Sequence, residues 1–165
     1  MPVLRQTTLA DAPAIDALLA LSYPRLLAPD YPAGRLAAVL PGITRAKPAL
    51  LESGTYFVLT EGSLALAAGG WTAGAPSRDA APTPDLGHVR HVVSHPDHLR
   101  QGHARRVMER VFRQARDHGM TALECLSTRT AVPFYASLGF RTEAEVEVTL
   151  AYGMTFPSIR MTRAL

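Results

Sequence analysis

An arginine-rich amphipathic helix between two apolar strands is the feature that most constrains how this chain can fold. Residues 102–118 repeat apolar side chains at intervals of three and one, which places them in a single stripe along a helix. Segments 88–94 and 121–126 on either side are short, apolar and typical of strands. A strand, a helix and a second strand in this order predict two parallel strands joined by a helical crossover. The stripe consists of Ala104, Val107, Met108, Val111, Phe112 and Ala115.

The rest of the chain supplies helices before this unit and strands around it. Thr8 and Asp11 are suited to cap the first turn of an N-terminal helix, and Tyr23-Pro24 should end that helix. Because 165 residues are enough for one hydrophobic core but not for two, the sequence predicts one mixed α/β domain over residues 1–165. The expected elements are helices over 8–23, 35–40 and 43–51, strands over 56–60 and 64–71, a loop over 74–85, a helix over 132–138, and strands over 141–150 and 158–161.

Composition excludes several classes of protein. A single cysteine, Cys125, excludes an intramolecular disulfide framework and a multi-cysteine zinc site, and we expect no metal. No run reaches the roughly 18 consecutive apolar residues that a membrane-spanning helix needs. The first residues also lack the order of a secretory signal. We therefore expect a cytoplasmic protein with no membrane partner.

Positive charge is concentrated in one segment. Residues 98–117 contain six arginines and two acidic residues, a balance of +4, whereas the whole chain carries +3. Such a segment suits an anionic ligand such as phosphate, although a charge run is also typical of a solvated helix face. The basic face has no interleaved aromatic side chains and the chain shows no known nucleic-acid-reading module, so we expect no nucleic-acid partner.

The start of this helix is a candidate anion site. A helix that begins soon after a strand presents backbone N–H groups without intrahelical acceptors, and its dipole adds partial positive charge. Gly102 would let a phosphate approach the main chain closely, and Arg100 adds a full positive charge beside it. A glycine in this position is also common for purely structural reasons.

Two separated motifs resemble the GCN5-related N-acetyltransferase (GNAT) superfamily. Residues 94–104, Ser-His-Pro-Asp-His-Leu-Arg-Gln-Gly-His-Ala, resemble the family's Arg/Gln-x-x-Gly-x-Gly/Ala motif and the Val-x-Pro that ends the strand before it. Leu99 stands where the family has Arg or Gln, and Ser94 stands where it has Val. Residues 131–140, Ala-Val-Pro-Phe-Tyr-Ala-Ser-Leu-Gly-Phe, resemble the block Ala-x-x-Phe-Tyr-x-x-x-Gly-Phe. The resemblance implies a mostly antiparallel sheet, flanked by helices, with one parallel pair of strands that splays apart.

The resemblance also implies acetyl-CoA as cosubstrate, bound where the parallel strands separate. The strand edge over 92–94 would pair with the pantetheine arm, and the amides of 100–104 would hold the pyrophosphate. A main-chain N–H near Val92 or Val93 would polarise the thioester carbonyl. The candidate cofactor-binding residues are Val92, Val93, Ser94, Arg100, Gln101, Gly102, His103, Ala104, Arg105, Ser127 and Phe134.

The implied reaction is transfer of the acetyl group to a primary amine of a small molecule or a protein, by direct attack through a tetrahedral intermediate. Tyr135 matches the family's general acid, because a phenol can protonate a thiolate leaving group. His88 is the candidate general base, since residues 88, 90, 92 and 94 share one face of a regular strand. His91 would face the other way unless a bulge intervenes.

Several points stay open at the level of sequence. Arg90 is suited either to hold an acidic group of the substrate or to pair with Asp85. Tyr23, Tyr31 and the loop over 74–85 are candidate acceptor contacts, and the apolar row on the last strands is a candidate homodimer interface. An alternative to an enzyme is a catalytically idle acyl-CoA-binding module with a regulatory role.

Overall fold

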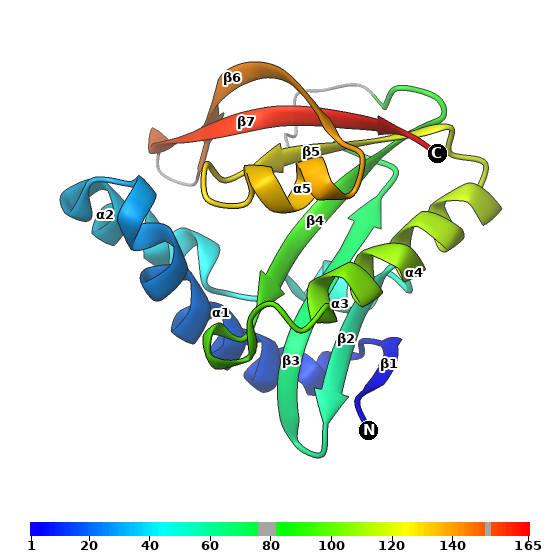
Figure 1. Cartoon of the computed structure of the whole chain (residues 1–165), viewed down its shortest axis with the longest axis horizontal. Helices are drawn as coiled ribbons and strands as arrows, with labels where there is room; N and C mark the ends of the chain where they lie inside the picture. Colours follow the sequence, from blue (N-terminus) through cyan, green and yellow to red (C-terminus); the bar gives the residue numbers. More distant parts are fainter. Residues whose placement is uncertain (76–81, 151–152) are drawn as a thin grey trace.

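A computed structural model describes residues 1–75, 82–150 and 153–165 of the chain. The described residues form one seven-stranded sheet in the order β1-β2-β3-β4-β5-β7-β6 (Figure 1). Only the neighbours β4 and β5 are parallel, and the other pairs are antiparallel. The strands are β1 (Val3–Gln6), β2 (Tyr56–Glu61), β3 (Leu64–Thr72), β4 (Leu86–Ser94), β5 (Ala122–Ser127), β6 (Arg141–Thr149) and β7 (Thr155–Ala164). The expected mixed α/β architecture with one parallel pair is confirmed.

Helices cover both faces of the sheet. Figure 1 shows α4 and α5 in front of the sheet and α1 behind it. Short 3₁₀ segments occur at η1 (Leu9–Asp11), η2 (Ala28–Asp30) and η3 (Pro96–His98). The helices are α1 (Ala12–Leu27), α2 (Ala33–Ile43), α3 (Pro48–Leu51), α4 (His103–Asp117) and α5 (Val132–Ser137).

Strand β2 is buried on both faces because each face meets a different helix. Phe57 and Leu59 pack in the cluster that contains the α4 stripe, whereas Tyr56 and Val58 pack in the cluster of α1. A strand with helices packed on both faces has apolar residues at successive positions, whereas a strand with one solvent-exposed face alternates apolar and polar residues. This explains why Tyr-Phe-Val-Leu stands in the sequence without polar interruptions.

The expected boundaries in the N-terminal block were wrong at two prolines. Helix α1 continues through Pro24 to Leu27, and α2 continues through Pro41 to Ile43. The packing of the residues beyond the first proline explains this, since Leu27 is buried at 3% exposure and lies in a cluster with α2. The piece expected over 43–51 is only the short helix α3. Strand β1 was not predicted, because its pairing partner β2 lies some fifty residues away in the sequence.

Strands β4 and β5 pair over a short stretch and then separate. Their register covers residues 86–88 of β4 and 122–124 of β5. Beyond this point β4 remains paired with β3 as far as Ser94, and β5 remains paired with β7 as far as Ser127. The two facing edges of β4 and β5 therefore open away from each other.

A β-bulge in β4 lies at the point of separation. Ala68 pairs with Val93 and Gly70 pairs with Arg90, so three steps along β4 oppose two along β3. His91, at the bulge, has a φ of 45°, in the left-handed region that a histidine rarely adopts. The extra residue reverses the alternation of side chains. His88 and Arg90 consequently share a face with Val93, and the expectation that His88 faces the same way as Val92 was wrong.

A capped first turn attaches the N-terminal helix to β1. The Asp11 carboxylate accepts the Thr8 backbone N–H at 2.8 Å, which confirms its expected capping role. The same carboxylate accepts two hydrogen bonds from the Arg5 guanidinium, at 2.7 and 2.9 Å. The Arg5 hydrogen bond is the main reason why the pKa of Asp11 is lowered.

We expect Asp11→Asn to lower the free energy of unfolding by about 1–2 kcal/mol at pH 7, because it removes the negative charge and one of the two oxygens that accept from Arg5. The folded-state pKa is lowered, so the contribution is complete above about pH 4 and disappears as the pH falls through the lowered value. Urea denaturation at several pH values measures this. Asp97→Asn, which breaks the exposed pair with Arg25, is the control and should cost much less. A loss for Asp11→Asn that does not change with pH would contradict this assignment.

Candidate active site

A groove of about 960 Å³ occupies the space where β4 and β5 separate. Its walls come from the end of β4, the loop before α4, the end of β5, α5 and the second half of α1. It contains every candidate cofactor-binding residue except Gln101, whose side chain faces His103 at 3.2 Å. The groove also contains Tyr135, His91, Tyr23 and Cys125, but not His88.

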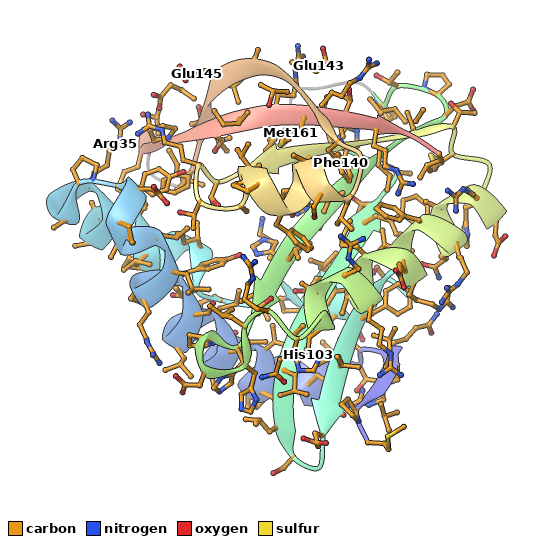
Figure 2. All side chains as sticks on the ribbon, in the orientation of Figure 1. Arg35, His103, Phe140, Glu143, Glu145 and Met161 are labelled. Carbon is orange, nitrogen blue, oxygen red and sulfur yellow. The ribbon has the colours of Figure 1, made fainter. Side chains whose placement is uncertain are left out.

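One end of the groove is built to attract an anion. Arg100 and Gly102 have φ values of 63° and 78°, so the loop turns sharply before α4 begins. The first N–H groups of α4 have no acceptor within the helix, and the helix dipole makes this end partially positive. A side chain added at Gly102 would meet nothing within 4 Å, so the space in front of this turn is open. Figure 2 shows His103 at this end of α4.

The other arginines of α4 are partly engaged within the protein. Arg105 donates to the Ser137 carbonyl and hydroxyl oxygens, at 3.4 and 3.3 Å. Arg106 donates to the Pro2 carbonyl, and the Arg110 guanidinium lies over the Phe57 ring. Arg100 and Arg105 are the two arginines of this segment that line the groove.

The bulge of β4 is held by a buried tyrosine that the sequence did not single out. The Tyr56 hydroxyl donates a hydrogen bond of 2.6 Å to the His91 carbonyl, and Tyr56 is 1% exposed. Three residues further on, the Ser22 hydroxyl of α1 donates to the Ser94 carbonyl at 2.7 Å. These two anchors fix the segment of β4 that borders the groove.

Tyr135 of α5 lines the groove and is buried. Its ring packs edge-on against Phe134 and Phe140, and the residue is 6% exposed. In the part of the chain that the structure describes, its hydroxyl makes no hydrogen bond. Burial raises the pKa of Tyr135 well above its ordinary value, so the phenol keeps its proton at neutral pH.

The neighbouring thiol of Cys125 is not set up as a nucleophile. Burial raises the pKa of Cys125 to about 12, so the reactive thiolate is absent at neutral pH. At 3% exposure the thiol is also shielded from solvent.

His88 lies at the last position at which β4 pairs with β5, opposite Glu124. Its Nδ1 is 3.4 Å from the Glu124 carboxylate and, among the described side chains, is the one buried polar atom without a hydrogen bond. Burial lowers the pKa of His88, although the Glu124 charge opposes this shift. Glu124 was missed at the level of sequence, where its signal is a single charged residue within an apolar strand.

His91 differs from His88 in its electrostatic surroundings. Its pKa is lowered to about 4, first by burial and then by the positive charges of Lys47 and Arg90. Both imidazoles are therefore neutral at pH 7. Among the described residues, a carboxylate lies beside His88 but none is paired with His91.

Tyr31, a candidate acceptor contact, is buried and is not among the residues that line the groove. Its hydroxyl donates to the Pro157 carbonyl at 2.9 Å and accepts the Arg129 backbone N–H at 2.8 Å. Its ring stacks on Phe156 with centroids 4.5 Å apart. These contacts tie η2 to β7 and to the loop after β5. Much of the other candidate, the loop over 74–85, lies outside the described residues, which omit 76–81.

Among the residues that the structure describes, no three or more His, Cys, Asp or Glu side chains lie together in a way that could hold a metal ion. Within the same residues, no helix is both long and apolar enough to cross a bilayer.

Comparison with known proteins identifies the family. Residues 50–162, more than half of the chain, match the family model described as an acetyltransferase (GNAT) domain. The chain belongs to the GCN5-related N-acetyltransferase (GNAT) family. The two sequence motifs that resemble this family border the groove described above.

Solved GNAT structures share the fold over the full length of the chain. A GCN5-related N-acetyltransferase from Rhodopseudomonas palustris matches with a TM-score of 0.78 and 20% identity, covering 100% of this chain and 96% of that one. The PaiA N-acetyltransferase from Thermoplasma acidophilum, solved with coenzyme A, matches with a TM-score of 0.75 and 10% identity over 100% and 99%. The ribosomal-protein-S18-alanine N-acetyltransferase from Escherichia coli matches with a TM-score of 0.64 and 18% identity over 99% and 94%. No protein of curated function matches the sequence.

The contrast between two tyrosines in this GNAT fold gives a stability prediction. Tyr56→Phe should lower the free energy of unfolding by about 1–2 kcal/mol, because it leaves the His91 carbonyl without its donor. Tyr135→Phe removes a hydroxyl without a hydrogen-bond partner and should cost less than about 0.5 kcal/mol. Urea denaturation measures both variants. Equal losses would show that the Tyr56 hydrogen bond does not hold the bulge.

Proposed function

We propose that this chain transfers the acetyl group of acetyl-CoA to a primary amine, with Tyr135 as general acid and His88 as general base. The observation that carries this proposal is a protonated phenol in a groove between separating parallel strands, with no hydrogen-bond partner among the described residues. An anion-attracting helix start lies at one end of the same groove.

The residues present suit the binding of acetyl-CoA. The free edge of β4 over 92–94 offers backbone groups to the amides of the pantetheine arm, and an N–H of Val92 or Val93 would polarise the thioester carbonyl. The turn over 100–104 offers backbone amides to the pyrophosphate. Leu99 stands where the family has Arg or Gln, so that polar side chain is missing here. The backbone amides of the turn are unaffected. Ser127 and Phe134 form the opposite wall, and Arg105 adds positive charge.

Acetyl-CoA supplies an activated acyl group whose leaving thiolate needs a proton. The conjugate thiol has a pKa of about 8.5 by analogy with cysteine, so a nearby phenol that has kept its proton can donate it. Tyr135 meets this requirement because its phenol is protonated at neutral pH and no other described residue shares a hydrogen bond with its hydroxyl.

The amine must lose a proton before it attacks, and His88 is the better base of the two histidines. Glu124 stabilises the imidazolium that forms when His88 accepts this proton. His91 gains no such support, because Lys47 and Arg90 oppose a positive charge there. His88 does not line the groove, so a water molecule would relay the proton to it.

We expect Tyr135→Phe to lower kcat by about 100-fold or more, the usual contribution of a general acid, and to change the Kd of acetyl-CoA by less than about threefold. Thiol release with a panel of primary amines gives kcat, and calorimetry gives the Kd. Cys125→Ala is the control, because it changes a buried side chain of the same groove that has no role in the proposed reaction, and it should keep kcat within about threefold. Full activity of Tyr135→Phe would remove its assigned role. Binding of acetyl-CoA without turnover of any amine would favour the idle binding module.

The base assignment predicts a pH dependence. The pKa of His88 lies below its ordinary value of 6.5, so kcat/KM should fall as the pH decreases below 6.5 and His88 becomes protonated. His88→Gln should abolish this fall and lower the rate at neutral pH by about 100-fold. His91→Gln should keep the fall in the acid range. If the fall of kcat/KM at acid pH disappeared in His91→Gln and persisted in His88→Gln, His91 and not His88 would be the base.

A further inference from the structure

Arg90 is a half-buried cation for which the described residues supply no counter-ion. It lies on β4 just before the bulge, on the face that it shares with His88. Its Nη1 donates to the Thr72 hydroxyl at 3.2 Å. No ion pair joins it to a carboxylate of the described residues, and Asp85, the alternative partner that the sequence offered, is not paired with it. Burial lowers the pKa of Arg90, and the nearby Tyr56 opposes this shift.

Such an arrangement is unfavourable unless an anion completes it. A guanidinium loses hydration when it is partly buried, and proteins normally compensate this loss with a carboxylate or a phosphate. Thr72 satisfies one N–H with a neutral hydroxyl, which supplies no negative charge. The planar guanidinium has further N–H groups, which suit the two oxygens of a carboxylate.

Arg90 does not itself line the groove, but its neighbours place it beside the proposed acceptor site. Its neighbour in sequence, His91, lines the groove, and its neighbour on the same face of β4 is the proposed base, His88. Lys47 adds positive charge to the same surroundings, because it and Arg90 both lower the pKa of His91. Glu124 lies instead against His88, 3.4 Å from its Nδ1, and no ion pair among the described residues joins it to Arg90.

We propose that the acceptor is an amine that also carries a carboxylate, as an amino acid does, and that Arg90 binds this carboxylate. The proposal rests on the proposed acetyl transfer at this groove and adds the class of acceptor to it. Arg90 is then a specificity-determining residue that contacts the substrate away from the atoms that react. Neutral amines would leave the Arg90 charge uncompensated in the complex.

The experiment compares amino acids with their own amides, which keep the amine and lose the negative charge. Thiol release gives kcat/KM for each pair, with wild type, Arg90→Met and Arg90→Lys. We expect wild type to prefer the acids by about tenfold or more. Arg90→Met should abolish this preference, mainly through KM of the acids, and Arg90→Lys should keep part of it. Asp85→Asn is the control and should leave the preference unchanged, and thermal denaturation shows whether each variant is folded.

Calorimetric titration of the same acids into the protein saturated with coenzyme A separates failure of this proposal from failure of the proposed function. Binding of acids that depends on Arg90, without turnover, would retain the carboxylate site and overturn acetyl transfer. Turnover of acids and amides at equal kcat/KM, unaffected by Arg90→Met, would retain acetyl transfer and overturn the carboxylate site. No turnover and no Arg90-dependent binding would overturn both.

Discussion

The groove depends on the short extent of hydrogen bonding between the parallel strands β4 and β5. The pairing ends at His88 and Glu124, while each strand continues along its other neighbour. The bulge at His91 changes the direction of β4 at this point, and its left-handed backbone needs external support. Tyr56 gives that support through its hydrogen bond to the His91 carbonyl. A fully paired sheet would have no free strand edge there and no space between the strands.

The bulge also separates the roles of neighbouring side chains. Val92 faces the α4 layer, whereas His88, Arg90 and Val93 face the α1 layer. The proposed acid, Tyr135, approaches the groove from α5, and the proposed base lies on the other side of the strand pair. The anion-attracting turn is at the start of α4, where Figure 2 shows His103. The arrangement thus gives separate positions to the cofactor, the leaving group and the acceptor.

Much of this fold could be predicted from local patterns. The stripe of α4, the hairpin of β2 and β3, and the parallel unit follow from periodicity, and the two motifs indicate the family. Most residues that line the groove could be predicted, because they belong to the two motifs or to segments next to them. The continuation of α1 through Pro24 could not be predicted, because it depends on the burial of Leu27 against α2. Strand β1 and the Tyr56 anchor likewise depend on partners distant in sequence. The bulge was not predicted, because an alternating pattern assumes that each residue of one strand faces one residue of its neighbour. The extra residue of the bulge places His88 and Val92 on opposite faces of β4.

The most direct test of this account is amide hydrogen exchange measured with and without acetyl-CoA. If the separated strand edge and the turn before α4 hold the cosubstrate, exchange should slow over 92–94 and 100–105. Exchange in β1 and in the outer strand β6, where Figure 2 shows Glu143 and Glu145, should not change. Absence of slowing in both of the first segments, or slowing confined to other parts of the sheet, would contradict the assignment of this groove.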